Sequence, residues 1–361
     1  MKYPTRPLIV ACLCALAWLD LRAAVADDTQ ILVQTADQQI IPAYHKLAVS
    51  TAALQDSAQS FCADPSDDGL TALREAFHAG MDNWESVQYL RFGPVEFLLR
   101  GSRFELWPDT RGTVGKHLRQ LLSDADPTSL EPMKFARGSV AVQGFSALEV
   151  LLFEDQAQAG LFGSNDAGRF RCAVVQAIAR NLAEMAAGIE ADWVDENQGH
   201  RRSFVTAEAG NDFYESARGP MGKLLNNLHT QLQFIGEQKL DRPLGSTLER
   251  ANGRRAESWL SGRSLRNIQD NLRGLQALYQ TAFAPQIADQ ELAGKIADGF
   301  AEALRRLENI PRPLHEAVSD PSARQTVVDL RSQIHDLEEL FSGPVPKALD
   351  LSLGFNSLDG D

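Results

Sequence analysis

The sequence predicts an all-α fold built from two helical domains. Apolar residues recur at spacings of three and four along nearly the whole chain, the period of a helix that buries one face. No segment shows the strict alternation of apolar and polar residues that half-buried strands require. About 335 residues follow a leader-like segment, which is enough for two domains.

The amino-terminal segment, residues 1–26, is expected to be a cleaved secretory signal. Lys2 and Arg6 precede an apolar run over residues 7–19, and Ala24-Val25-Ala26 stands directly before Asp27. This layout predicts export. Residues 9–12 only faintly resemble a lipoprotein processing box, and they lie too near the start to have an apolar core before them, so a lipid anchor is not expected.

Beyond this segment the chain is acidic. Without residues 1–26, 32 Lys and Arg stand against 47 Asp and Glu, a formal charge of -15. Nucleic acid is therefore not an expected partner, because phosphate binding needs the opposite sign. No later segment approaches about 18 uninterrupted apolar residues, so no transmembrane segment is predicted.

Two cysteines remain after the predicted signal, which contains Cys12 and Cys14. Cys62 and Cys172 form an even pair in an oxidising compartment, and we predict a disulfide between them. Two buried free thiols are the alternative. A thiolate metal site is not expected, because neither cysteine has a Cys or His nearby at ligand spacing.

The first half of the chain is predicted to form a series of helices. The first covers residues 31–61 with a kink at Pro42, because proline removes a backbone hydrogen bond and crowds the preceding turn. The stretch 64–69 separates it from a second helix over residues 70–90, which ends at Gly93-Pro94. Further helices are expected at residues 114–122, 134–153, 172–194 and 206–238.

The most polar stretch between long periodic segments, residues 195–204, places the join between the domains near residue 200. The predicted domains are therefore residues 27–200 and 201–361. In the second domain, helices are expected at residues 256–283, 286–307 and 324–341, with Pro311, Pro313, Pro321 and the stretch 343–346 as interruptions.

Residues 144–153, Gly-Phe-Ser-Ala-Leu-Glu-Val-Leu-Leu-Phe, predict a buried helix, because the segment is apolar on nearly every side. Gly144 would allow a neighbouring backbone to approach closely. Glu149 is a carboxylate in this apolar setting, so we expect an arginine, a metal or hydroxyl groups beside it, or a bound proton. Ser146 is expected to bond the carbonyl of Val142, four residues back.

This segment resembles the signature of the imelysin family, bacterial envelope proteins classed as metallopeptidases, in which Gly-x-His-x-x-Glu precedes an apolar run. Ser146 stands where the family has histidine. Residues 84–94, 106–111 and 354–361 are similar to further family landmarks. The resemblance implies two packed helical bundles, a periplasmic location and an association with the acquisition of iron or another metal.

The missing histidine favours a non-catalytic binding or accessory protein. A metallopeptidase of the imelysin type is one alternative, although the His-Glu-x-x-His pattern of common zinc peptidases is absent. The other alternative is a structural or interaction module in which Ser146 and Glu149 only brace the core. A metal or an anionic ligand is an expected partner, and an envelope protein is a further one.

Candidate binding residues surround a predicted groove between the bundles. Four arginines, Arg91, Arg100, Arg103 and Arg111, lie near two sharp bends and could serve as counter-charges for Glu149. Alternatively, they form a pocket with tryptophans for an anionic or chelated ligand, or they cap carbonyls around irregular backbone. The candidates are Gly144, Ser146, Glu149, Trp84, Arg91, Arg103 and Trp107, with Glu149 alone as a candidate ligand for iron or another divalent metal.

His335 precedes Glu338 and Glu339 by three and four residues, a spacing that serves metal sites in bundles when the side chains face inward. Because His335 lies beside the apolar face of its helix and not on it, a solvated surface is the preferred interpretation.

Overall fold

Helices make up all the regular secondary structure of residues 28–154, 158–163 and 165–354, which are the residues that the computed structural model describes. This confirms the predicted all-α fold. The predicted signal at residues 1–26 lies outside the described residues, as does nearly all of the landmark at residues 354–361. No helix in the described part of the chain is both long enough and apolar enough to cross a membrane.

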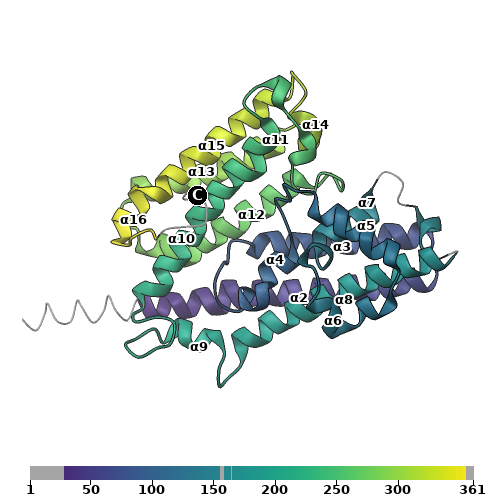
Figure 1. Ribbon diagram of the computed structural model, residues 1–361. Helices are drawn as coiled ribbons and strands as arrows, with labels where there is room; N and C mark the ends of the chain where they lie inside the picture. Colours follow the sequence, from purple (N-terminus) through teal and green to yellow (C-terminus); the bar gives the residue numbers. More distant parts are fainter. Residues whose placement is uncertain (1–27, 155–157, 164, 355–361) are drawn as a thin grey trace, which may run out of the picture.

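The first bundle is built around α2 (Ile41–Ala63), which packs against both α3 (Asp67–Val87) and α8 (Asp166–Val194). Figure 1 shows these long helices in the lower part of the molecule, with shorter helices beside them. The shorter helices are α4 (Arg100–Phe104), α5 (Thr113–Asp124), α6 (Pro132–Ala136), α7 (Phe145–Phe153) and α9 (His200–Val205).

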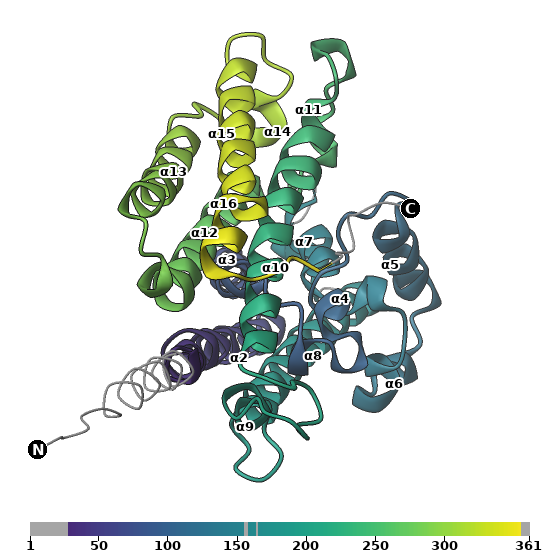
Figure 2. The same ribbon diagram turned by 90° about the vertical axis from the view of Figure 1, so that its left-hand side faces the viewer.

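The second bundle contains four long helices, and Figures 1 and 2 both show it above the first. Neighbouring members pack in the order α10, α15, α13, α12 and back to α10. These helices are α10 (Arg218–Phe234), α12 (Ser264–Leu278), α13 (Gln290–Glu308) and α15 (Arg324–Ser342), joined by α11 (Arg242–Leu244), α14 (Leu314–Ala317) and α16 (Pro344–Leu349). The two bundles meet where α12 packs along α3.

Short 3₁₀ segments connect many of these helices. They are Gly93–Val95, Phe97–Leu99, Pro127–Leu130, Val140–Val142, Ala159–Leu161, Leu248–Arg250, Gly253–Arg255 and Ala284–Gln286. The short helix α9 contacts α8, so the contacts of the first bundle continue past residue 200. The exact position of the domain join therefore stays a prediction.

Three π-helical segments each end two residues before a proline. They are Ala36–Ile40 before Pro42, Ile235–Asp241 before Pro243 and Tyr279–Phe283 before Pro285. A proline cannot donate the hydrogen bond that an α-helix requires, and the wider π turn moves the bonding pattern past it. The predicted interruption at Pro42 takes this form, and the chain stays helical from residue 28 to residue 63.

Several predicted helix limits are wrong. The helix expected at residues 134–153 is broken into α6, a 3₁₀ turn and α7, with Gly138 and Gly144 in the breaks. The segments expected to begin at residues 206 and 256 become helical only at Arg218 and Ser264. Tyr214, Ala217 and Ala256 pack against the bundles from irregular backbone, which periodicity alone does not distinguish from a helix.

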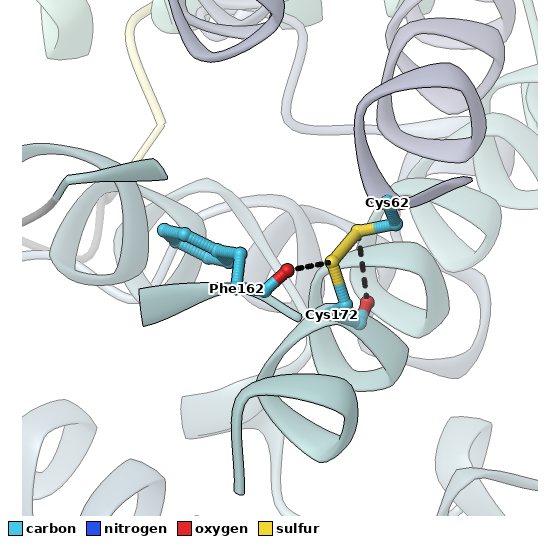
Figure 3. Close-up of a disulfide and its surroundings, with 3 residues drawn as sticks. All are labelled: Cys62, Phe162 and Cys172. Atoms are coloured by element: carbon cyan, nitrogen blue, oxygen red, sulfur yellow. Dashed lines mark hydrogen bonds between the residues drawn. A yellow bond between two sulfur atoms is a disulfide. The ribbon is translucent and has the colours of Figure 1, made fainter. Parts of the chain in front are cut away.

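The predicted disulfide is confirmed. Cys62 lies at the end of α2 and Cys172 near the start of α8, with their Cα atoms 5.5 Å apart (Figure 3). The carbonyl oxygen of Phe162 lies 3.7 Å from the sulfur of Cys172. The bridge therefore fastens together two of the helices that form the core of the first bundle.

Candidate functional site

Four charged side chains are buried where the bundles meet, and we call Glu85, Glu105, Glu257 and Lys239 the acidic cluster. Glu85 lies on α3 and Glu105 follows α4, whereas Lys239 and Glu257 come from the second half of the chain. The ammonium of Lys239 lies 2.8 Å from Glu85 Oε2 and 2.6 Å from Glu257 Oε2. These three side chains are at most 1% exposed, so the ion pairs lie inside the protein.

The cluster places three carboxyl groups around one ammonium. Burial and the neighbouring Glu257 raise the pKa of Glu85 to about 7, and burial with Glu257 raises the pKa of Glu105 well above its usual value. Burial opposes the charged form of Lys239, but the carboxylates of Glu257 and Glu85 outweigh it and raise the pKa of this lysine. The lysine therefore stays charged at neutral pH, while the surplus acid is readily protonated.

Two asparagines on α12 donate hydrogen bonds to the cluster. Asn271 Nδ2 lies 2.8 Å from Glu85 Oε2, and Asn267 Nδ2 lies 2.8 Å from Glu257 Oε2. The asparagines are four residues apart and so share one face of the helix. The other oxygens, Glu85 Oε1 and Glu257 Oε1, are buried without a hydrogen-bond partner.

Glu105 is held by the first bundle. Its Oε2 accepts hydrogen bonds from Trp84 Nε1 at 2.9 Å and from Gln88 Nε2 at 3.0 Å. Both donors lie at the carboxyl end of α3, and the cis peptide bond Trp107–Pro108 follows Glu105 closely in sequence. Through these bonds Glu105 connects Trp84 and Gln88 of the segment 84–94 with the acidic cluster.

The acidic cluster has the donor atoms of a metal centre. One oxygen from each of Glu85, Glu105 and Glu257 lies within 4.8 Å of the others, and among the described residues no second group of three or more potential ligands meets this spacing. Carboxylate oxygens suit hard cations, and the unpartnered oxygens of Glu85 and Glu257 add free lone pairs. The donors therefore fit such an ion, although the Lys239 ammonium already pairs with two of the three carboxyls and would compete with it.

A pocket of about 370 Å³, which we call the tryptophan pocket, opens beside Glu105. Trp84, Arg91 and Trp107 of the predicted site all line it. The guanidinium of Arg91 lies 4.9 Å from the centre of the Phe234 ring and donates to Gln231 Oε1 at 3.2 Å, so α10 of the second bundle holds this arginine of the first.

A second pocket, of about 590 Å³, contains Ser146 and Glu149, and we call it the motif pocket. Glu105 and Trp107 line it as well, so they separate it from the tryptophan pocket. Three further cationic residues line the motif pocket, namely Arg242, Arg254 and Arg255. Two of these guanidinium groups lie over tryptophan rings, Arg242 at 6.0 Å from Trp107 and Arg254 at 5.4 Å from Trp259.

Glu149 is bound by a hydroxyl group, one of the partners expected from the sequence. Its Oε1 accepts hydrogen bonds from the backbone N–H and the side-chain O–H of Ser261, at 2.9 and 2.6 Å. Burial raises the pKa of Glu149, and the Ser261 bonds partly offset that effect. Ser146 donates to the carbonyl of Leu106 at 3.3 Å and not to Val142, because α7 begins only at Phe145.

The remaining candidates hold the first bundle together. A Cβ atom on Gly144 would lie 2.2 Å from the carbonyl oxygen of Phe104, which confirms the expected close approach of two backbones. Arg103 donates to Gln143 Oε1 at 2.6 Å and to Asn181 Oδ1 at 2.9 Å, and it lines neither pocket. The structure thus brings Ser146, Glu149, Trp84, Arg91 and Trp107 to the two pockets and leaves Gly144 and Arg103 in supporting positions.

A second polar contact joins α3 to the start of α12. Arg263 is 1% exposed, and its guanidinium lies 2.8 Å from Asp82 and 3.7 Å from Asp270. It also lies 3.1 Å from His78 Nδ1, and burial together with Arg263 lowers the pKa of this histidine to about 4. Burial and Asp82 raise the pKa of Asp270 to about 7.

None of the four residues of the acidic cluster, Glu85, Glu105, Lys239 and Glu257, was among the site residues predicted from the sequence. A signal was present for Glu85, since it follows Met81 by four residues and therefore continues the buried stripe of α3. No comparable pattern marks Lys239, which reaches the cluster from a π-helical segment, or Glu257, which lies in a turn before α12.

The imelysin family model matches residues 40–341. The chain is 22% identical over 311 residues to Iron-regulated protein A of Synechococcus elongatus, which covers 82% of this chain and 80% of that protein.

Two solved structures share the fold. An imelysin-like protein from Psychrobacter arcticum 273-4 matches with a TM-score of 0.75 at 22% identity, covering 92% of this chain and 98% of that one. A protein from Parabacteroides distasonis, provisionally named an iron-regulated protein A precursor, matches with a TM-score of 0.72 at 14% identity, over 88% of this chain and 95% of that one.

Proposed function

This chain belongs to the imelysin family, and from that membership we propose that it is an exported, non-catalytic accessory protein that binds an anionic complex of iron or another metal between its bundles. The names of two relatives refer to iron regulation, which supports the choice of iron. The predicted signal supports a periplasmic location.

The composition of the motif pocket is the observation that carries this proposal. Arg242, Arg254 and Arg255 line it together with Glu149 and Glu105. Guanidinium groups bind carboxylates through paired hydrogen bonds, and tryptophan rings beside them supply flat apolar contact. An anionic chelate offers carboxylates to the arginines and also carries a metal that acidic side chains can approach.

The acidic cluster favours a complex over a bare ion. Lys239 lies 2.6 and 2.8 Å from two of the three carboxyls, so a free cation would have to displace a buried ammonium. Separating a buried charge from its partners costs about 3–5 kcal/mol. A chelate held in the motif pocket needs no such displacement.

Ser146 supports a binding role over peptide hydrolysis. Its hydroxyl donates to the carbonyl of Leu106, and it supplies no imidazole to a metal or to a water molecule. Glu149, its neighbour in the motif, is bonded to Ser261. The pair therefore lacks the nitrogen ligand on which common zinc peptidases depend.

Isothermal titration with ferric citrate as the probe tests this function on the chain without residues 1–26. We expect one complex per chain, and replacing Arg254 and Arg255 by glutamine should weaken binding roughly tenfold or more per arginine. Arg250→Gln is the matched control, because Arg250 is exposed in the same segment and does not line the motif pocket.

Absence of binding, or equal binding by the double variant, would contradict the proposal. Zinc-dependent cleavage of a protein substrate by the purified chain would support a peptidase instead. Fractionation of cells that produce the full chain tests the location, since the proposal requires the shortened protein in the periplasm.

A further inference from the structure

A group of histidine and glutamate side chains lies on the second bundle, apart from the pockets described above. His229 on α10 and His335 and Glu338 on α15 form this group, which we call the histidine cluster. His229 lies two positions before Gln231, whose side chain bonds Gln88 of the first bundle. Two residues turn a helix by about 200°, so His229 points away from the junction and toward α15.

Glu338 lies between the two imidazoles. Its Oε1 is 3.5 Å from His229 Nε2, and its Oε2 is 3.4 Å from His335 Nδ1. The side chains of His229 and Glu338 are 12% and 23% exposed, so this part of the cluster is largely withdrawn from water.

The two distances from Glu338 oxygens to imidazole nitrogens are longer than good hydrogen bonds between nitrogen and oxygen, which are about 2.7–3.2 Å long. Ligand atoms about 2.1 Å from a tetrahedrally coordinated ion stand about 3.4 Å apart. The two distances in the cluster are close to this value. Each imidazole therefore stands at about the separation of two ligands from one oxygen of Glu338, His229 from Oε1 and His335 from Oε2.

His335 must turn to complete a three-ligand site, because the three ligand atoms do not yet lie within 4.8 Å of one another. Its side chain is 50% exposed, and its other nitrogen is 3.4 Å from Glu339 Oε1. The nearby cation Arg331 forms its ion pair with Asp241, at 3.0 Å, and not with Glu338.

We propose that His229, His335 and Glu338 form a surface site for a divalent transition-metal ion on the second bundle. Two imidazole nitrogens with one carboxylate suit zinc, nickel, copper or ferrous iron better than calcium or magnesium, which prefer oxygen ligands alone. The site joins α10 to α15 and draws its ligands from the second half of the chain.

Zinc titration of the chelator-stripped chain without residues 1–26, followed by calorimetry and by NMR of the imidazole resonances, tests this site. We expect one zinc ion that shifts the signals of both His229 and His335. His229→Gln and His335→Ala should each weaken binding by more than about tenfold, the cost of losing even an outer partner of a metal ligand.

His45→Ala is the matched control, because His45 forms a single surface pair with Glu190 at 2.7 Å and should leave zinc binding unchanged. Glu85→Gln separates this site from the acidic cluster and should also leave the imidazole shifts in place. The proposal is overturned if zinc fails to shift the two histidine signals, or if either histidine variant binds zinc as well as the parent chain.

Discussion

Lys239 is the residue on which the charge of the acidic cluster most depends. It contacts Glu85 and Glu257 within a region that water does not reach. A buried ion pair adds little net stability, because desolvation offsets the attraction, but an unbalanced buried charge is strongly destabilising. The surplus of carboxyl groups over ammonium therefore makes the stability of the protein sensitive to protons.

We predict that Glu85 contributes a decrease in the free energy of unfolding as the pH rises from about 5 to about 8. The pKa of Glu85 in the folded protein, about 7, exceeds the ordinary value of 4.5, so the folded state binds the proton more tightly than the unfolded chain. This stabilisation is complete below the unfolded value and is lost as the pH rises through about 7. Urea unfolding at a series of pH values measures it.

Glu85→Gln should flatten the pH dependence, because glutamine does not titrate. Asp270 has a pKa of about 7 for the same reason and contributes in the same direction, so Asp270→Asn should remove a separate part of the slope. An unchanged slope in both variants would show that other groups control the effect.

At the scale of the helices, periodicity predicted most of the elements but not their breaks. Residues 324–341 were predicted as a helix and form α15 almost to the residue, since apolar positions and flanking prolines agree there. Residues 134–153 were predicted as one helix and form three elements, because Gly138 lies in a local turn after α6 and Gly144 meets the distant backbone of Phe104. The close backbone contact between Gly144, at the start of α7, and Phe104, at the end of α4, leaves no periodic pattern in the sequence.

The same limit applies to the site. Ser146, Glu149 and the two tryptophans could be selected because they lie in distinctive segments. Lys239 and Glu257 could not, because they become neighbours of Glu85 only when segments more than 150 residues from α3 fold against it. A single sequence contains no information on such pairing beyond composition.

Gly144→Ala should destabilise the protein by about 3 kcal/mol, at the upper end of the usual cost of overpacking. The added Cβ would lie 2.2 Å from one carbonyl oxygen and 2.3 Å from the next, and backbone on both sides limits relaxation. Thermal unfolding followed by circular dichroism measures the loss. Gly294→Ala on α13 is the control, since its Cβ meets nothing within 4 Å, and it should stabilise the helix slightly.

At the scale of the whole molecule, a covalent bond secures the first bundle and buried polar contacts secure the junction. The bridge between Cys62 and Cys172 closes a loop across 110 residues of sequence. Contacts between the bundles are made by Lys239, Arg263, Ser261 and Asn271. Reduction should therefore weaken the first bundle directly and the junction only through it.

Replacing Cys62 and Cys172 by serine should lower the free energy of unfolding by roughly 4–5 kcal/mol, the loop-closure contribution expected for this length. Urea unfolding of the parent chain with and without a reducing agent should reproduce most of this difference. The serine variant should not respond to the reducing agent, and a response would mean that the effect does not come from this bridge.

The long separation between the partners in the acidic cluster has a consequence for synthesis. Ribosomes make the chain from its amino end, so Glu85 emerges 154 residues before the lysine that neutralises it. During that interval the carboxyl group must remain hydrated or carry a proton, because it cannot be enclosed as a lone anion. The surface of the first bundle that meets the second therefore stays hydrated until the second bundle is in place, and the closing of this contact is a late step in folding.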